Sequence, residues 1–146
     1  MRMILVIVYC FTILRPPTWE PNFEKALQIA RERNELVLLN FSGSDWCGPC
    51  IRMRNEIFDD ATFRAMADTS IIMVNADFPR NKKNQLDKKL KAQNEALADR
   101  YNPEGKFPFT VLLNAKGEIV KAWDGLPNET APQFAAQIKK ICDDNR

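Results

Sequence analysis

The chain has 146 residues, of which 45% are hydrophobic and 27% charged, and its formal net charge is +2 at pH 7. These values are typical of one soluble globular domain and exclude a disordered chain, and the near-neutral charge argues against nucleic acid as the main partner. Because the sequence has no histidine and only two of its four cysteines are close together, it also excludes imidazole catalysis, most zinc sites and a disulfide-dense scaffold.

The chain begins with an apolar segment that has two interpretations. Residues 3–14 form an apolar run of twelve residues behind Arg2, and Pro16 and Pro17 end it. The run is shorter than the roughly 20 residues of a membrane-spanning helix but suits the apolar region of an export signal. No small-residue cleavage site follows, and its composition equally suits a first strand. Residues 1–17 are therefore either a signal remnant or a first strand, and residues 18–146 form the domain.

A helix and a strand follow and lead to a short cysteine motif. Asn22 is a candidate N-cap, and apolar residues recur at helical spacing after it, namely Phe23, Leu27 and Ala30. The spacing predicts a helix over residues 23–33. Residues 36–41 are almost continuously apolar, as in a strand covered on both faces. The motif, residues 46–50, comes next and is followed by two apolar stretches with helical spacing, so we expect it at a strand-to-helix turn.

The middle of the chain adds a second strand and a basic helix. Residues 71–76 are again apolar and predict a buried strand. Apolar residues that can share one helical face follow, namely Leu86, Leu90, Leu97 and Tyr101. We expect a docked helix over residues 84–101 with a basic outer side. A solvated helix face is the simpler interpretation of its lysines, and recognition of an acidic partner is the alternative.

The last third of the chain predicts a hairpin and a final helix. Residues 107–113 and 118–123 read as two strands, joined by a turn that Gly117 closes. Thr130 and Gln133 have the spacing of a capping box, and an apolar stripe follows them. Cys142 lies in the last turn of this helix, where we expect an inert structural thiol, and we expect Cys10 to be a packed thiol.

The position of Cys47 and Cys50 suggests their chemistry. Unpaired N–H groups at the first turn of a helix stabilise an anion, which favours the Cys47 thiolate. Cys47 is then expected to attack a substrate disulfide, and Cys50 to resolve the mixed disulfide. Zinc lacks further ligands, and haem attachment fails because residue 51 is Ile rather than His. A purely structural disulfide stays open as an alternative, and we expect neither a metal nor a cofactor.

Trp46-Cys47-Gly48-Pro49-Cys50 resembles the active site of the thioredoxin family. The resemblance extends from about Trp19 to the C-terminus and implies an α/β thioredoxin fold. In that fold a central mixed sheet of about four to five strands is flanked by helices, here with a helical insert before the cis-proline. Phe107-Pro108 resembles the family's substrate-binding cis-proline, although a strand-start proline is the alternative. Gly125 resembles the glycine that admits a partner's chain. The resemblance implies a set of substrate-binding residues: Trp46, Gly48, Pro49, Phe107, Pro108 and Gly125.

Two residues depart from the family pattern. The family's buried carboxylate falls at or beside Asn40, and its lysine partner aligns with about Met73, so neither position can titrate. Proton transfer to Cys50 must then come from water or another group, with Asp45 and Asp77 as candidates. The loop before the motif and the basic insert are more similar to bacterial envelope members than to cytosolic thioredoxin. We therefore expect a periplasmic or envelope location, with the cytoplasm as the alternative.

These features predict a thiol:disulfide oxidoreductase that acts mainly as a reductase, with isomerase activity next. Its expected partners are protein disulfides and an upstream thiol reductant, without nucleic acid. Membrane association is expected only if the N-terminal apolar segment is retained, and we expect a monomer. The alternative is a peptide-binding or chaperone-like module that uses Trp46, Phe107 and Pro108, with incidental cysteines.

Overall fold

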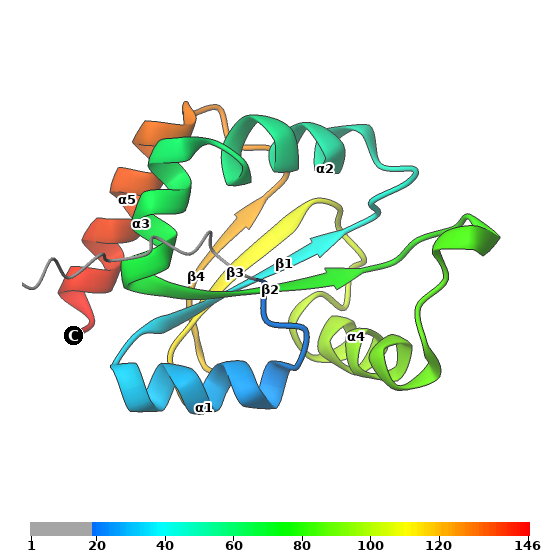
Figure 1. The fold of residues 1–146 in the computed structure, drawn as a ribbon, viewed down its shortest axis with the longest axis horizontal. Helices are drawn as coiled ribbons and strands as arrows, with labels where there is room; N and C mark the ends of the chain where they lie inside the picture. The colour runs from blue at the N-terminus through cyan, green and yellow to red at the C-terminus, as the bar shows by residue number, and fades with distance from the viewer. Residues whose placement is uncertain (1–18) are drawn as a thin grey trace, which may run out of the picture.

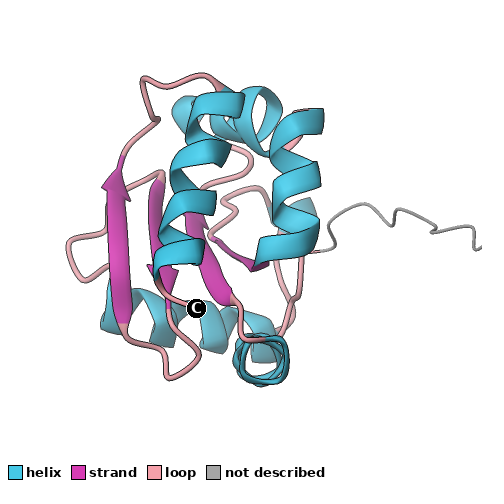
Figure 2. Cartoon of the chain, turned by 90° about the vertical axis from the view of Figure 1, so that its left-hand side faces the viewer, coloured by secondary structure: helices cyan, strands magenta, loops and turns pink. Residues whose placement is uncertain are grey.

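The computed structural model describes residues 19–146, and residues 1–18 lie outside the described part, so both interpretations of residues 1–17 remain predictions. The described chain forms a four-stranded sheet with strand order β2-β1-β3-β4 (Figure 1). Figure 2 shows the strands side by side with helices around them. No helix among residues 19–146 is long and apolar enough to cross a membrane.

Helices and strands alternate along the described chain in the predicted order. Their bounds are α1 Phe23–Arg33, β1 Leu36–Ser42, α2 Gly48–Met53, α3 Ala61–Ser70, β2 Ile71–Asp77, α4 Lys88–Tyr101, β3 Phe109–Leu113, β4 Ile119–Asp124 and α5 Ala131–Asp144. A π-helical segment, η1 Arg54–Phe58, continues α2, and a 3₁₀ turn, η2 Lys82–Asn84, follows β2.

The sheet is mixed because β1 pairs in parallel with β2 and antiparallel with β3, which in turn pairs antiparallel with β4. Successive residues of a strand point to opposite faces, so β1 contributes to two cores. Leu38 packs with Met53 and Phe134 on the side of α2, α3 and α5. Leu39 packs with Leu97 on the side of α1 and α4. Figure 1 shows these two helical layers on opposite sides of the sheet.

Local capping explains why some helix bounds match the prediction to the residue. The side chain of Asn22 accepts a hydrogen bond from the N–H of Lys25, and Asn34 ends α1 in the left-handed conformation with φ of 53°. Thr130 and Gln133 form the predicted capping box at the start of α5. These signals act within one turn, so sequence alone can place them.

Three predicted starts are wrong by one to four residues, and β1, β2 and β4 each end one residue later than predicted. The basic helix begins at Lys88 rather than residue 84, because Asp87 caps it by accepting a hydrogen bond from Leu90 N–H. The hairpin strands begin at Phe109 and Ile119 rather than at residues 107 and 118. Phe107 and Pro108 form a loop with a cis peptide bond ahead of β3.

Candidate active site

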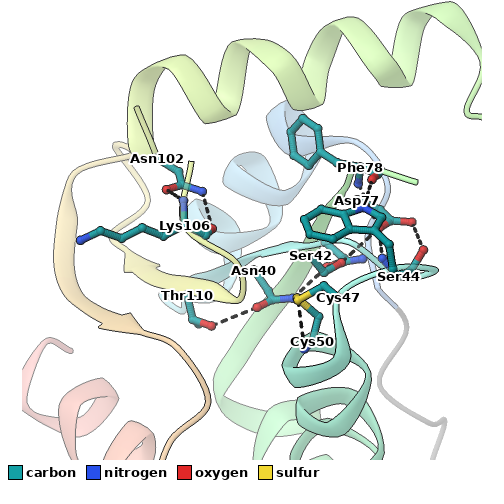
Figure 3. The surroundings of a disulfide bond; sticks show 12 residues. Asn40, Ser42, Ser44, Cys47, Cys50, Asp77, Phe78, Asn102, Lys106 and Thr110 are labelled. Carbon is teal, nitrogen blue, oxygen red and sulfur yellow. Dashed lines mark hydrogen bonds between the residues drawn. A yellow bond between two sulfur atoms is a disulfide. The ribbon is translucent and has the colours of Figure 1, made fainter. Parts of the chain in front are cut away.

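The cysteine motif occupies the turn between β1 and α2, as its spacing predicts. Cys47 is the N-cap of α2, and its Sγ accepts a hydrogen bond from the N–H of Cys50 at 3.3 Å. The two residues form a disulfide with a Cα–Cα distance of 5.2 Å (Figure 3). A thiolate at Cys47 would gain this same N–H donor and the positive end of the helix dipole.

Exposure does not distinguish the two cysteines. Cys47 and Cys50 are each 5% exposed, whereas Gly48 and Pro49 between them are exposed. The predicted order, in which Cys47 attacks first, therefore rests on the N-cap position of Cys47 and not on a difference in burial.

The peptide bond between Phe107 and Pro108 is cis, as the resemblance implies. The proline precedes β3 rather than opening it, which argues against a simple strand-start proline. Gly125 donates its N–H to the carbonyl oxygen of Pro108 at 2.9 Å. Its φ is +84°, and no atom lies within 4 Å of the space that a Cβ would occupy, so the backbone is open to an approaching chain there.

Trp46 links the motif to the loop before the cis-proline. Its ring packs edge-on against Phe107 with 5.4 Å between centroids, and Phe107 in turn contacts Phe78. The indole N–H of Trp46 donates to the carbonyl oxygen of Phe78 at 2.7 Å. A Cβ at Gly43 would lie 2.2 Å from the indole, so only glycine fits beneath this ring.

Two carboxylates fix the segment after β2 to the motif loop. Asp45 accepts hydrogen bonds from the N–H groups of Arg80 and Asn81 and from the side chain of Asn84, at 2.9 to 3.0 Å. These hydrogen bonds lower the pKa of Asp45 below its usual value, and the bond from the Arg80 N–H has the largest effect. Asp77 accepts from the N–H and hydroxyl of Ser44 (Figure 3). The sequence suggested both carboxylates only as proton acceptors and held no signal for this structural role.

A polar network lies on the strands beneath the motif. The hydroxyl of Thr110 donates to Asn40 Oδ1 at 3.0 Å, and Asn40 Nδ2 donates to Asn75 Oδ1 at 3.0 Å. The register of β1 and β2 places Asn75 opposite Asn40 and Met73 opposite Leu38. The position of the family's lysine on β2 stays a prediction, and the β2 residue that contacts Asn40 is Asn75. Its polar side chain within the apolar run of β2 was the available signal.

Cys50 borders a cavity of about 250 Å³. Its wall consists mainly of amide, hydroxyl and apolar side chains: Trp19, Asn40, Ser42, Ser44, Cys50, Ile51, Arg54, Asn55, Phe58 and Asn75. The only charged residue in this wall is Arg54, and neither Asp45 nor Asp77 belongs to it. The cavity gives the buried sulfur of Cys50 a polar surrounding without a carboxylate.

A family model described as "Thioredoxin-like" matches residues 18–115, about two thirds of the chain. The chain belongs to this thioredoxin-like family. Its sheet of four strands and flanking helices confirms the fold that the resemblance implies.

Similar proteins carry names from disulfide chemistry. The disulfide bond reductase DsbH of Chlamydia pneumoniae is 33% identical over 100 residues, which cover 68% of this chain and 58% of the relative. The thioredoxin-related protein DsbJ of the same organism is 25% identical over 123 residues, 84% of this chain and 34% of the relative. A solved structure described as a DsbH oxidoreductase has a TM-score of 0.79 at 26% identity, over 88% of this chain and 86% of that chain. The chain thus spans 58% and 34% of the lengths of the two curated relatives.

The third cysteine of the described thioredoxin-like domain lies apart from the motif. Cys142 is free, 1% exposed and packed in the core between the sheet and α5. Burial raises the pKa of its thiol to about 11, so the sulfur stays protonated at neutral pH. This agrees with the predicted structural role. Within residues 19–146 no group of three or more His, Cys, Asp or Glu side chains could hold a metal ion.

Proposed function

We propose that this chain is a thiol:disulfide oxidoreductase that mainly reduces disulfides of protein substrates and secondarily isomerises them. The observation that carries the proposal is the Cys47–Cys50 disulfide at the N-terminus of α2, with Trp46 packed against Phe107 before the cis-proline. The printed names of the relatives, a disulfide bond reductase and a thioredoxin-related protein, support the same chemistry.

The reaction proceeds in two exchange steps. The Cys47 thiolate attacks one sulfur of the substrate disulfide, forms a mixed disulfide and releases the other substrate sulfur as a thiolate. The Cys50 thiolate then attacks Sγ of Cys47 and releases the second substrate thiolate, which takes up a proton. The substrate gains two electrons and the pair becomes the disulfide that the structure contains. A thiol reductant must return two electrons to the pair before the next cycle.

The substrate chain lies across the surface formed by the motif and the two loops opposite it. Gly48 and Pro49 are exposed beside the cysteines, and Trp46 and Phe107 supply aromatic contact area. Gly125 leaves its backbone accessible and holds the carbonyl of Pro108 by its own N–H. These residues make a site for an extended polypeptide rather than for a small molecule.

The partners are protein disulfides and an upstream thiol reductant, and the chain acts as a monomer. We place this activity in the periplasm or cell envelope, where substrate disulfides form and persist. Membrane association follows only if residues 1–17 are retained. N-terminal sequencing of the protein recovered from fractionated cells tests both statements, and recovery from the cytoplasmic fraction contradicts the location.

An insulin-reduction assay with cysteine variants tests the activity. Cys50→Ser should lose turnover and accumulate a covalent mixed disulfide through Cys47, because the resolving sulfur is missing. Cys142→Ser is the matched control and should keep wild-type turnover. Trapping through Cys50 in a Cys47→Ser variant, with none in Cys50→Ser, would reverse the assigned roles. If the wild type neither reduces insulin nor forms the mixed disulfide yet binds peptide, the chain is instead a peptide-binding module.

A further inference from the structure

One short segment after β2 holds six of the 21 basic residues of the chain. We call its six cations the basic insert surface: Arg80, Lys82, Lys83, Lys88, Lys89 and Lys91. With one carboxylate, Asp87, residues 80–91 have a formal charge of +5, so the rest of the chain carries −3 of the total of +2. The near-neutral total therefore hides a strongly polarised molecule.

None of these six cations is neutralised by a carboxylate of the described domain. All six residues are exposed, and none of their side chains forms an ion pair within residues 19–146. Lys88 and Lys89 are the first two residues of α4, where the helix dipole disfavours a cation. Unpaired charges in unfavourable positions indicate that their counter-charges come from another molecule.

The first half of the basic insert surface, Arg80, Lys82 and Lys83, is fixed beside the cysteine motif. Asp45, two residues before Cys47, binds Asn81 and Asn84 and so holds Lys82 and Lys83 from both sides. The guanidinium of Arg80 lies 3.7 Å from the ring centroid of Trp46. Figure 1 shows the η2 turn beyond the end of β2, on the side where the loop between β1 and α2 also lies. A partner bound here has its disulfide within reach of the motif.

The surface is also hollowed in a way that fits a protein rather than a flat polyanion. A cavity of about 120 Å³ lies next to α4, lined among others by Pro79, Leu86, Lys91 and Asn94. Asn94 is 1% exposed, and its Oδ1 accepts no hydrogen bond from a described residue. A partner's side chain can enter this hollow beside Lys91 and Glu95, whereas a lipid surface supplies no such insertion.

We propose that the basic insert surface docks an acidic face of the protein substrate and so selects disulfides that lie beside clustered Asp and Glu residues. This inference rests on the proposed function and names its substrate class. Complementary charge raises the rate of encounter and fixes orientation more than it tightens the final complex. The preference for acidic substrates should accordingly appear in the second-order rate constant and weaken with salt.

The test measures a single turnover, so that no physiological reductant is needed. Two synthetic peptides of equal length each contain one intramolecular disulfide, flanked by four Glu residues in one and by four Gln residues in the other. The pre-reduced protein is mixed with each peptide, and its oxidation is followed by tryptophan fluorescence. The docking variant is K82Q/K83Q/K88Q, and the matched control is K116Q/K121Q/K140Q, which removes three exposed lysines outside the surface.

The wild type should react about 10-fold faster with the Glu peptide than with the Gln peptide at low salt, and the ratio should approach one near 1 M salt. The docking variant should lose most of this preference while it reacts with the Gln peptide at the wild-type rate. The control variant should keep the preference.

Equal rates with both peptides for the wild type at low salt would overturn the proposal. An equal loss of preference in the docking and control variants would overturn it too, because net charge alone would then explain the effect. Binding of the wild type, but not the docking variant, to phosphatidylserine vesicles without any peptide preference would assign the surface to a membrane instead. If neither peptide oxidises the reduced protein, the proposed function fails. Fluorescence anisotropy of the Glu peptide then tests the docking surface alone. Weaker binding to the docking variant than to the control variant supports the docking proposal, and equal binding overturns it.

Discussion

The substitution N40D puts a titrating group into the network beneath the motif. Asn40 is 5% exposed, donates its Nδ2 to Asn75 Oδ1 and accepts from the hydroxyl of Thr110. An ionised carboxylate at this position can still accept from the Thr110 hydroxyl but can no longer donate to Asn75. The Asn75 amide can rotate so that its Nδ2 donates to the new carboxylate and to Ser42 Oγ, while the Ser42 hydroxyl donates to Asp77 Oδ1, so the hydrogen bonds can be re-formed around a buried charge.

The size of the effect follows from burial of the new charge at a position that is 5% exposed. Burial disfavours the ionised form of a carboxyl by one or more pKa units, so we expect N40D to unfold about 2 kcal/mol more easily at pH 8. This cost falls on the ionised form and raises the pKa of the new carboxyl by about 1.5 units above its unfolded value near 3.9. Protonated, the same carboxyl can donate to Asn75. The stability difference between N40D and wild type should therefore become small below pH 4 and grow as the pH rises through the raised pKa.

Urea unfolding of the oxidised protein, followed by tryptophan fluorescence at pH 4 and pH 8, measures this difference. The matched control is N128D, which makes the same change at an exposed position. N128D should show no difference between the two pH values relative to wild type. The reasoning is refuted if the gap between N40D and wild type is the same at pH 4 and pH 8, because the introduced carboxyl would then be fully hydrated.

Two further predictions concern the packing around the motif and the isolated cysteine. G43A should lower the free energy of unfolding by about 1–3 kcal/mol and shift the tryptophan fluorescence, because a Cβ at this position displaces the indole of Trp46. G48A is the control and should show neither change, because the space around its Cβ is open. Cys142 should resist iodoacetamide at pH 8 in the folded protein and react in guanidinium chloride, since its pKa is raised to about 11 and the residue is 1% exposed. Mass spectrometry of separate peptides distinguishes it from Cys10, and rapid labelling in the native state contradicts the burial.

Features encoded within a few residues could be predicted from the sequence, and contacts across the sheet could not. Asn22 and Asn34 bound α1 at the predicted positions because each acts on its own helix turn. Asn40 was recognised as polar, but its partners lie 35 and 70 residues away. A shift of two residues in the pairing of β1 with β2 keeps the same face buried, so the apolar pattern alone does not show whether Met73 or Asn75 lies opposite Asn40.

The segment after β2 illustrates a second limit on what the sequence can predict. The helix over residues 84–101 was predicted from its apolar face alone, and its start is wrong by four residues. Asp87 caps α4, whereas Asn84 ends the 3₁₀ turn η2 and donates its side-chain amide to Asp45, 39 residues away. This long-range contact brings Lys82 and Lys83 to the active-site end of the molecule.

The cavity behind Cys50 determines how this sulfur exchanges protons. When the pair is reduced, a negative charge on Cys50 faces amides, hydroxyls and the cation Arg54 rather than a carboxylate. Asp45 and Asp77, the two candidates from the sequence, are both engaged by the N–H groups of loops. The cavity of about 250 Å³ has amide and hydroxyl groups in its wall and room for several water molecules, because each occupies about 30 Å³. We therefore propose water as the proton carrier for Cys50, and the second exchange step should then follow the ionisation of the cysteines themselves rather than that of a neighbouring acid.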